Sequence, residues 1–397
     1  MNFVHTADIH LGFVQYGLME RFRDYARAFR QIVDYALSQH VECVLICGDM
    51  FHHRSINSPT YVQAYRLLAP LKEAGIPVVA IEGNHDLALE RDRYSWLAAL
   101  EAQGLITLLN PTQNGIITHT QVGDTRIFGT RWLGSSTAHH IPRIAEEIAA
   151  IEKAEHTVLM MHCALEGTSI RSGVVPMGSL MQLKEHVDYL ALGHYHIPFE
   201  RDGWIYNPGS PEMVSLGDLA DVRGFYHATE EGATFVPISP RPVLEVCVDA
   251  TGITTPEELY ERIAEQTAAA VKGQTPDKPI VVLTIEGTLG LSSSALSTSR
   301  MVDAVQGVCD ALTVRPRMKT SRPQLVPLRG AHALRMEEVE RQVLMELASA
   351  DGRYAGIEGL ADALLEIKRH AALGERERAR ALIDELLRRQ RSADKGD

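Results

Sequence analysis

The sequence predicts an α/β fold for about its first 240 residues, because short apolar runs of strand length alternate there with amphipathic helical patterns. The apolar runs cover residues 41–47, 78–81, 157–161 and 189–192. Between the first two runs, apolar residues recur at helical spacing over residues 22–36. A second helical stretch, 61–71, is followed by the stop signals Gly75 and Pro77. We therefore expect βαβ units around a buried sheet.

Composition limits the class of protein. The 397 residues are 45% hydrophobic and 23% charged, which is typical of a globular protein of two or three domains. The longest apolar runs are strand-sized, far short of the ~18 residues that cross a membrane. The chain also passes from Met1 directly into an apolar strand without a basic leader segment. We expect a cytoplasmic protein that has no contact with membranes.

Cysteine usage and net charge argue against further classes. The five cysteines are scattered without a CxxC pair, which argues against a disulfide framework and against a zinc–thiolate site. Asp and Glu number 51 against 39 Lys and Arg, so the net charge is −12. A protein held on nucleic acid by bulk positive charge would instead be strongly basic. Any binding of DNA must therefore depend on local groups of cations.

A second unit is expected after a proline-rich joint at residues 236–242. Its pattern is strand, helix, strand, helix and strand, at residues 243–248, 256–271, 279–285, about 294–308 and 311–314. This predicts a small α+β domain at residues 241–320. Residues 321–330 contain two prolines and a glycine and are predicted to be a linker. Residues 331–397 have a helical pattern, with apolar stripes that another surface must cover.

Possible metal ligands follow five of the expected strands, at the point where each strand ends. They are Asp8 and His10, Asp49, Asn84 with His85, His162, and His194 with His196. Because the carboxyl ends of the strands of an α/β sheet lie at one edge, we expect these side chains to converge there. A lone Asp-x-His or Gly-His pair has no such meaning. Several other histidines, such as His40 and His119, are expected to be surface or core residues.

The types of these residues favour a site for two metal ions. Asp, Asn and His offer oxygen and imidazole donors without thiolate, which suits manganese, iron or zinc. Even without His85, the seven remaining groups are too many for one tetrahedral ion. They suit two ions roughly 3.5 to 4 Å apart that share a bridging carboxylate, as in phosphoester hydrolases. Glycines before Asp49, Asn84 and His194 allow a tight turn at each strand end.

These motifs, in this order, resemble those of the calcineurin-like metallophosphoesterases. Within that superfamily the chain is similar to the SbcD and Mre-eleven family of nucleases, which repair DNA double-strand breaks. The similarity rests on the segments TADIHLG at 6–12, GDMFH at 48–52, NSP at 57–59 and NPGSPE at 207–212. The Phe51-His52 extension separates this group from the protein phosphatases. The resemblance covers about residues 1–240, whereas the later regions match in position and size.

The resemblance implies a metallophosphoesterase α/β sandwich core at residues 1–240, a cap domain at 241–320 and two divalent metal ions, with manganese expected. One metal would be held by Asp8, His10, Asp49 and His196. The other would be held by Asp49, Asn84, His162 and His194, so that Asp49 is the bridge. Two such cations lower the pKa of a shared water to give hydroxide near neutral pH and neutralise charge on the phosphodiester.

The resemblance also implies three catalytic residues. His85 is left off the metals and would protonate or stabilise the leaving oxygen, and Asp86 would orient its ring. His52 would contact the phosphate. The alternative for His52 is a loop histidine without function, because it lies beside His53 and Arg54, which do not belong to the family pattern.

DNA contacts are expected in the cap domain. Four cations cluster near its end, namely Arg315, Arg317, Lys319 and Arg322. Such a cluster could track phosphates. Arg23, Arg27 and Arg30 form a second stripe at helical spacing, for which a solvated face is the favoured interpretation.

Protein partners are expected on the basis of the resemblance as well. The chain has no P-loop motif, so it should not hydrolyse ATP itself. An SbcC-like coiled-coil ATPase is expected to dock on the helices of residues 331–397, and a self-contained helical subdomain is the alternative. A homodimer is expected through helices near residues 61–71 and 94–100.

We therefore expect a manganese-dependent DNA exonuclease and endonuclease that acts on ends, hairpins and single-strand regions in double-strand-break processing. One alternative is a metallophosphoesterase that hydrolyses small cyclic or linear phosphodiesters, because the metal core alone does not select the substrate. His52 and residues 207–212 favour the nuclease. The alternative from another class is a DNA-end-binding scaffold with little activity, and the intact ligand set counts against it.

Overall fold

The computed structural model describes residues 1–111, 115–168, 172–219, 222–273, 276–292, 295–321, 336–350 and 359–393. The chain divides into two compact units, Met1–Arg322 and Pro323–Asp397. The first unit contains both the expected α/β region and the cap domain. The expected linker begins at Ser321, the last residue of a strand, and its other residues lie outside the described part of the chain.

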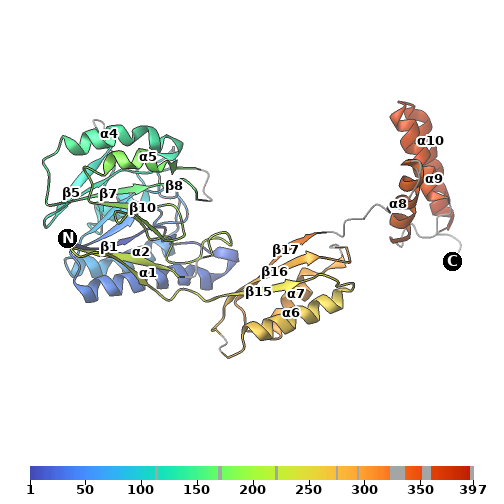
Figure 1. Ribbon diagram of the computed structural model, residues 1–397, viewed down its shortest axis with the longest axis horizontal. Helices are drawn as coiled ribbons and strands as arrows, with labels where there is room; N and C mark the ends of the chain where they lie inside the picture. Colours follow the sequence, from blue (N-terminus) through green and yellow to red (C-terminus); the bar gives the residue numbers. More distant parts are fainter. Residues whose placement is uncertain are drawn as a thin grey trace. The chain divides into compact units, whose positions relative to one another are not determined.

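Two six-stranded sheets form the core of the first unit (Figure 1). The first sheet has the order β14 (Gly232–Pro237), β13 (Gly224–Thr229), β1 (Asn2–Thr6), β2 (Cys43–Cys47), β3 (Val78–Ile81) and β4 (Thr107–Leu108). The second has the order β11 (Phe199–Arg201), β12 (Ile205–Asn207), β10 (Tyr189–Gly193), β7 (His156–His162), β6 (Thr125–Gly129) and β5 (Thr118–Val122). Neighbours from β1 to β4 pair parallel, as do β6, β7, β10 and β12, whereas β5, β11, β13 and β14 pair antiparallel.

Helices cover the outer face of each sheet, so the core is a sandwich of four layers (Figure 1). The helices α1 (Met19–Gln39), α2 (Ser58–Glu73) and α3 (Trp96–Ala102) pack on the first sheet. The helices α4 (Thr137–Ala149) and α5 (Met177–Leu180) pack on the second. Short elements complete the unit: 3-10 turns at Gln15–Gly17, Gly134–Ser136 and Met181–Leu183, and the parallel pair β8 (Ala164–Leu165) and β9 (Val174–Val175).

Local sequence explains α1 and α2, the two long helices that pack on the first sheet. In α1, buried apolar residues recur at helical spacing and face the sheet, among them Phe29 and Ile32. The helix α2 begins after Asn57, whose side chain accepts a hydrogen bond from the Thr60 backbone N–H at 3.0 Å. Pro59 stands in the first turn, where no intrahelical N–H is needed. Both helices lie where helical spacing predicts them.

A buried histidine joins the two sheets. The His5 side chain of β1 is fully buried, and its Nε2 donates to the Leu192 carbonyl oxygen at 2.9 Å. Its Nδ1 therefore accepts from the Tyr189 hydroxyl at 3.0 Å. Burial lowers the pKa of His5 to about 3, although the bond to Leu192 opposes this shift. His5 is thus a packing residue held in its neutral form.

The cap domain alternates strands and helices as predicted. It consists of β15 (Val243–Asp249), α6 (Pro256–Ala270), β16 (Ile280–Thr288), α7 (Thr298–Gln306) and β17 (Thr313–Ser321). The three strands are parallel with β16 in the centre, and the two helices share one apolar core with the sheet. The last strand was expected to end at residue 314, but it continues to Ser321 because β16 pairs with it over nine residues. Arg315, Arg317 and Lys319 therefore lie on a strand.

Buried charges connect the cap domain to α1. The Arg21 guanidinium contacts the carboxylates of Asp24 at 2.8 Å and Glu212 at 3.0 Å. Arg241, at the start of the cap domain, donates to both Asp24 oxygens at 2.7 and 2.8 Å. Its backbone N–H donates to Glu212 at 2.9 Å. All four side chains are buried, and the two cations balance the two anions.

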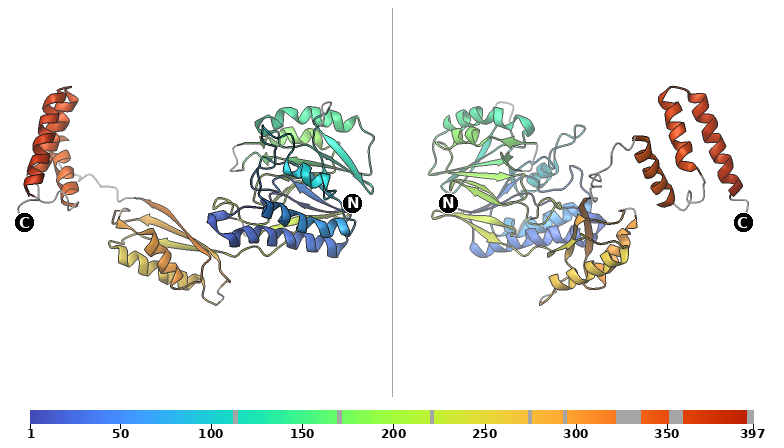
Figure 2. Two further views of the ribbon diagram at one scale, coloured as in Figure 1. Left: turned by 180° about the vertical axis from the view of Figure 1, so that it is seen from behind. Right: turned by 45° about the vertical axis from the view of Figure 1, so that its right-hand side comes forward.

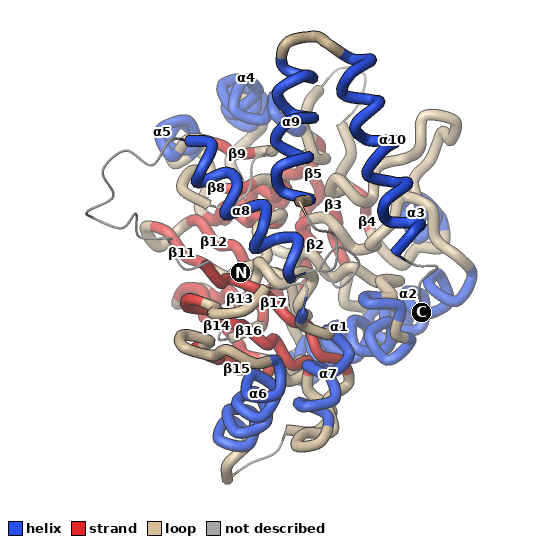
Figure 3. The backbone as a smooth tube through the Cα atoms, turned by 90° about the vertical axis from the view of Figure 1, so that its right-hand side faces the viewer, coloured by secondary structure: helices blue, strands red, loops and turns tan. Residues whose placement is uncertain are grey.

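The second unit contains three helices in its described residues, α8 (Met336–Ala350), α9 (Leu360–Ala372) and α10 (Arg376–Ala393). Figures 2 and 3 show α9 beside both α8 and α10. Arg341 of α8 pairs with Asp362 of α9 at 2.6 Å, and Glu340 pairs with Lys368 at 2.5 Å. Helices were expected here. Among the described residues, no helix is both long and apolar enough to span a membrane.

We expect acid to destabilise the protein partly through His5. The ordinary pKa of 6.5 applies in the unfolded chain, whereas the folded chain holds His5 neutral down to about pH 3. The unfolded state therefore binds more protons between these values, and the free energy of unfolding falls as pH decreases through this range. Urea unfolding of wild type and His5→Gln should be measured at several pH values. The free energy of unfolding should fall less steeply with decreasing pH in the variant, with a slope that is smaller by the equivalent of about one proton. If the free energy of unfolding depended on pH in the same way in both proteins, His5 would have no part in acid destabilisation.

Candidate metal centre

Five strand ends bring the predicted ligands together at one edge of the two sheets. Asp8 and His10 follow β1, Asp49 follows β2, and Asn84 follows β3. In the second sheet, His162 is the last residue of β7, and His194 and His196 follow β10. These strands are parallel within each sheet, so their carboxyl ends lie side by side.

The backbone at these strand ends is unusual. Asp8, His10, Asp49 and His194 have positive φ values of 52°, 51°, 52° and 90°. Eight non-glycine residues of the described chain have a positive φ, and four of them are predicted ligands. Such conformations are costly for residues with a Cβ and cluster at functional sites. Packing and hydrogen bonds of the surrounding strands hold these side chains toward the common edge.

The glycines beside the ligands serve two different needs. Gly48 has a φ of +86°, as a tight turn requires, and a Cβ there would also collide with the His162 ring. Gly83 and Gly193 have ordinary φ values, so the expectation of a tight turn does not explain them. A Cβ at Gly83 would overlap the Asp49 carboxylate, and one at Gly193 would overlap the Cys47 carbonyl oxygen. These two glycines permit close packing of neighbouring strand ends.

A first group of ligand atoms comes from Asp8, His10 and His196, which lie within 4.8 Å of one another. The Nε2 atoms of His10 and His196 are 3.2 Å apart, and His196 Nε2 is 3.9 Å from Asp8 Oδ1. Two donors that bind one ion side by side at about 2.1 Å are separated by about 3 Å. The spacing of the two imidazole nitrogens therefore fits a shared cation.

A second group comes from Asp49, His162 and His194, again within 4.8 Å of one another. His162 Nε2 is 3.4 Å from Asp49 Oδ2 and 3.3 Å from the Asn84 side-chain oxygen. Asp49 Oδ2 also faces the first group, at 4.0 Å from His10 Nε2. One buried carboxylate oxygen thus lies between the two groups, where a bridging ligand is expected.

The charges of the second group are strongly coupled. Burial opposes ionisation of Asp49, but the neighbouring His162 outweighs it and holds the pKa of Asp49 well below its usual range. Conversely, burial disfavours protonated His162, but the Asp49 carboxylate raises the pKa of His162 to about 9. A proton on His162 occupies the place of a cation. Binding of a metal ion here must therefore release that proton.

Hydrogen-bond acceptors orient three of the imidazole rings through the ring nitrogen that faces away from the ligand groups. His196 Nδ1 is 2.9 Å from an Asp218 carboxylate oxygen, which leaves Nε2 toward the first group. His162 Nδ1 donates to the Cys47 carbonyl oxygen at 2.8 Å, and His194 Nε2 donates to that of Ser172 at 2.9 Å. Such acceptors fix the tautomer and orientation of metal-binding histidines.

Asp218 was not found by sequence reasoning. Its carboxylate also accepts from the backbone N–H groups of Ser215 at 2.8 Å and Val214 at 3.3 Å, and so closes the loop that carries it. The one signal in the sequence is the Gly-Asp pair at 217–218, which repeats the pair at 48–49. No expected strand precedes it, so strand-end reasoning did not select it.

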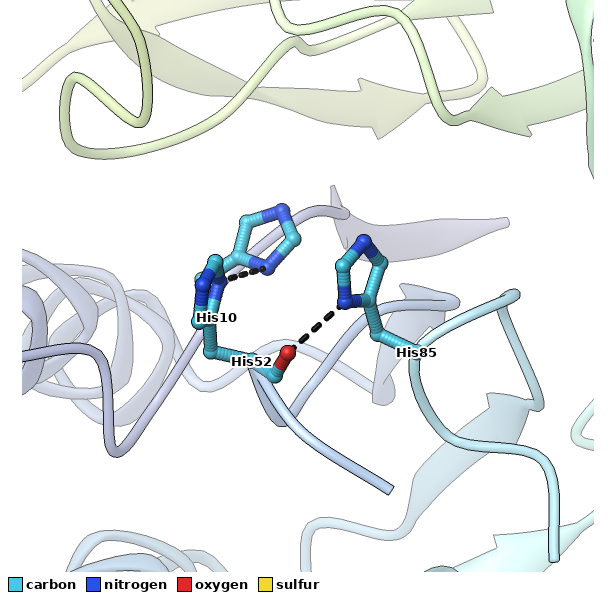
Figure 4. Close-up of side chains that lie close together, drawn as sticks. All are labelled: His10, His52 and His85. Atoms are coloured by element: carbon cyan, nitrogen blue, oxygen red, sulfur yellow. Dashed lines mark hydrogen bonds between the residues drawn. The ribbon is translucent and has the colours of Figure 1, made fainter. Parts of the chain in front are cut away.

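A third cluster, of His10, His52 and His85, lies beside the first group (Figure 4). His85 Nδ1 donates to the His52 carbonyl oxygen at 2.7 Å, and its ring centre is 5.2 Å from that of His10. The His52 ring stacks on Phe13 at 3.6 Å, and its Nδ1 is 3.3 Å from His10 Nδ1. His52 and His85 are therefore fixed side chains at the edge of the ligand groups.

The expected role of Asp86 is corrected by its contacts. Asp86 was expected to orient the His85 ring, but the His52 carbonyl oxygen does so. The Asp86 carboxylate is buried and accepts backbone N–H groups of Met50, Phe51 and Gly83 at 3.2, 3.0 and 3.1 Å. Burial and the Asp49 charge raise its pKa to about 8. Asp86 ties the loops after β2 and β3 together.

Two of the four predicted cations of the cap domain contact the core. Arg315 lies over the Tyr16 ring, 4.3 Å from its centre. Arg317 donates to the Leu216 carbonyl oxygen at 3.3 Å, in the loop that Asp218 closes. Lys319 is exposed, and Arg322 lies outside the described residues.

The arginine stripe on α1, at residues 23, 27 and 30, is partly engaged in contacts within the protein. Arg27 pairs with the buried Asp24 at 2.6 Å, and Arg30 donates to the Arg66 carbonyl oxygen at 3.2 Å. Arg23 is exposed. Two of the three stripe residues thus have partners within the protein.

Comparison with known proteins places the chain in a family. Residues 1–198 match the family model for calcineurin-like phosphoesterases. The DNA double-strand break repair protein Mre11 of Archaeoglobus fulgidus is 30% identical over 295 residues, which cover 66% of this chain and 64% of the relative. The Mre11 protein of Haloferax volcanii is 31% identical over 66% of this chain and 58% of its own length. That of Sulfolobus acidocaldarius is 24% identical over 75% of this chain and 78% of its own length.

The chain therefore spans less than two thirds of the length of the Archaeoglobus fulgidus and Haloferax volcanii relatives. The family match covers the strands that carry the ligand groups, from Asp8 to His196. Together these observations show that the chain belongs to the calcineurin-like phosphoesterases and that, among them, it is similar to the Mre11 DNA double-strand break repair proteins.

Proposed function

We propose that this protein is a two-metal, manganese-dependent DNA exonuclease and endonuclease that processes double-strand breaks. The observation that supports it most is the buried Asp49 carboxylate between two groups of oxygen and imidazole donors. Asp8, His10, Asp49 and His196 would hold one ion, and Asp49, Asn84, His162 and His194 the other. The absence of thiolate from this donor set favours manganese over softer metals. Bound there, the ions would activate a water molecule and neutralise charge on the phosphate.

His85 is placed to act on the leaving oxygen. Its Nδ1 proton is committed to the His52 carbonyl oxygen, so Nε2 is the position that can hold and release a second proton. The protonated ring would donate from Nε2 to the oxygen that leaves the phosphorus. The bond to His52 also fixes the ring plane, because rotation would break it. His85 would thus serve as a general acid that binds no metal.

His52 is proposed to contact the phosphate. Its ring is held between Phe13 and the His10 and His85 rings, unlike a free loop histidine. Because Nδ1 faces His10, Nε2 remains available for a phosphate oxygen. Burial, with the nearby His53, lowers the pKa of His52 to about 3, so the neutral ring would donate a hydrogen bond from Nε2.

Two other functions are the alternatives to a nuclease. A metallophosphoesterase for small cyclic or linear phosphodiesters needs the same metal centre, and only the substrate distinguishes it from a nuclease. The similarity to Mre11 proteins, over 66% and 75% of the chain, favours DNA. A DNA-end-binding scaffold with little activity needs no intact centre, yet all seven predicted ligands are present and close together.

The second unit is proposed as the docking site for an SbcC-like coiled-coil ATPase. Ile383 and Leu387 are spaced one helical turn apart on α10, and their side chains are 43% and 47% exposed. Leu373, at the end of α9, is 68% exposed. A helical partner could cover such residues by laying its own apolar face against them. The alternative, a self-contained subdomain, leaves them in water.

A homodimer is proposed through α2 and α3. Val62 and Tyr65 of α2 are 42% and 45% exposed, and Trp96 at the start of α3 is 37% exposed. Tyr61 and Trp96 rings contact each other at 5.9 Å, so the two helices offer one apolar surface. Sedimentation of Tyr65→Glu should give a monomer where wild type gives a dimer. An unchanged sedimentation coefficient would exclude this surface.

The assignment of His85 can be tested with end-labelled duplex and hairpin DNA. Wild type should shorten both in a manganese-dependent way, and His85→Gln should cut about 10²- to 10⁴-fold more slowly because the general acid is lost. Elemental analysis should find two metals in both proteins, whereas the control Asp49→Ala loses them. Loss of metal from His85→Gln would refute the division of roles. If both proteins hold metal and neither cuts DNA, the result favours the small-phosphodiester function or a nuclease that is silent without its ATPase.

The DNA-binding role of the cap domain can be tested by charge reversal. Arg315→Glu with Arg317→Glu should reduce the slope of log binding constant against log salt by about 2, because two phosphate contacts are lost. Arg262→Glu on α6 changes the same charge away from β17 and should leave the slope unchanged. Thermal unfolding would show whether loss of the Tyr16 and Leu216 contacts destabilises the protein. An unaltered slope in a folded double variant would exclude the cluster.

Truncation after residue 330 tests the docking site. The shortened protein should remain folded and cut DNA with manganese, because the first compact unit is intact. It should no longer co-purify with the ATPase, since the apolar residues of α9 and α10 are gone. Ile383→Asp with Leu387→Asp in the full chain should have the same effect. Co-purification of the shortened protein would refute docking through these helices.

A further inference from the structure

A cavity of about 360 Å³ lies beside the metal centre. It is formed by the loop between β3 and α3, the start of α3 and the segment that follows β6. Its lining includes Glu82, Arg93, Asn110, Arg131 and Trp132. Pockets for small organic ligands begin at about 300 Å³. The cavity can therefore take one nucleoside but not a longer segment of DNA.

Trp132 connects this cavity to the proposed metal ligands. Its backbone N–H donates to the Glu82 carbonyl oxygen at 2.7 Å, directly before Gly83 and Asn84. The position of a Cβ at Gly173 would be 3.1 Å from Trp132 Nε1 and 3.5 Å from His194 Nε2. The indole thus lines the cavity and also approaches His194. The cavity is therefore connected to the ligand groups through Glu82, two residues before Asn84, and through Gly173, which borders both Trp132 and His194.

Two polar atoms of the cavity residues have no hydrogen-bond partner in the described part of the chain. Trp132 Nε1 is a buried donor and the Asn110 side-chain oxygen is a buried acceptor. An unpaired buried polar atom is costly, so such atoms indicate a ligand or ordered water. A nucleobase edge offers both donors and acceptors. The largely buried Glu82 carboxylate, which lines the same cavity, can accept further N–H groups.

Charge and aromatic surface fit a nucleotide as well. Arg93 and Arg131 are exposed at the cavity, and neither forms an ion pair with a described carboxylate. Guanidinium groups bind phosphate oxygens, and indole rings provide a face on which bases stack. The part of the cavity at the buried Glu82 carboxylate suits a base. The part at the exposed arginines suits a phosphate.

We propose that this cavity binds the nucleoside adjacent to the bond that is cut, with the base against Trp132 and the neighbouring phosphate at Arg93 and Arg131. The inference rests on the proposed nuclease function and specifies how the substrate is held. It distinguishes substrates that carry a nucleobase from phosphodiesters that have none, because a diester without a base leaves the cavity empty. The two arginines would bind the phosphate of any nucleotide with equal strength. Trp132 would contribute to binding only when the ligand carries a base.

Calorimetric binding of two ligands to the manganese-loaded full chain tests this site. Deoxyadenosine 5′-monophosphate and 2-deoxyribose 5-phosphate carry the same phosphate, so contacts with metal cancel in their comparison. Wild type should bind the nucleotide about tenfold more tightly, as expected for stacking of one base on an aromatic ring. Trp132→Ala should reduce this ratio to near one, and Trp132→Phe should keep most of it.

Two further variants separate the parts of the site. Arg131→Gln should weaken both ligands by the same factor, because it removes only a phosphate contact. The matched control Arg143→Gln, on α4 away from the cavity, should change neither affinity. Equal binding of both ligands by wild type, or a ratio that persists in Trp132→Ala, would overturn the inference. Cleavage of DNA by wild type is measured separately, so loss of the nuclease function and loss of this site give different results.

Discussion

The centre depends on burying carboxylates in the gap between two sheets without leaving them unpaired. Asp8 and Asp49 are almost inaccessible to water, where an unpaired charge would cost several kcal/mol (about 3–5 when a partner is removed). Backbone N–H groups offset part of this cost: that of His194 donates to both Asp8 oxygens, and that of His85 donates to Asp49. The strand ends must therefore keep their positions for these bonds to exist. The left-handed backbone at the ligands follows from the same requirement.

The sequence was sufficient to predict the strand ends that meet at the centre. Each ligand follows an apolar run, and parallel strands place their carboxyl ends together, so the convergence of Asp8, Asp49 and His162 needed no three-dimensional information. The helices α1 and α2 and the order of elements in the cap domain were also found from periodicity and stop signals. These features depend on local pattern, which a single sequence displays.

Features that depend on long-range contacts were not predicted. Asp218 acts on His196 from a loop whose position is set by Arg223, which donates to the Asp218 carbonyl oxygen and to Ser210. The role of Asp86 was assigned wrongly because adjacency in sequence to His85 suggested contact, whereas burial directs the carboxylate to backbone N–H groups. The length of β17 depends on pairing with β16 and cannot be seen in its own residues. Each of these errors concerns a partner that is distant in the chain.

The buried contacts of Arg241 join the cap domain to the core. The first residue of the cap domain is bound to α1 through Asp24 and also to Glu212, so the connection between the two parts is held at a buried point. Arg315 and Arg317 of the same domain contact the core at two further points, the Tyr16 ring and the Leu216 carbonyl oxygen. One of these points touches the loop that orients His196. The cap domain and the side chain that orients His196 thus contact one and the same loop, at Leu216 and Asp218.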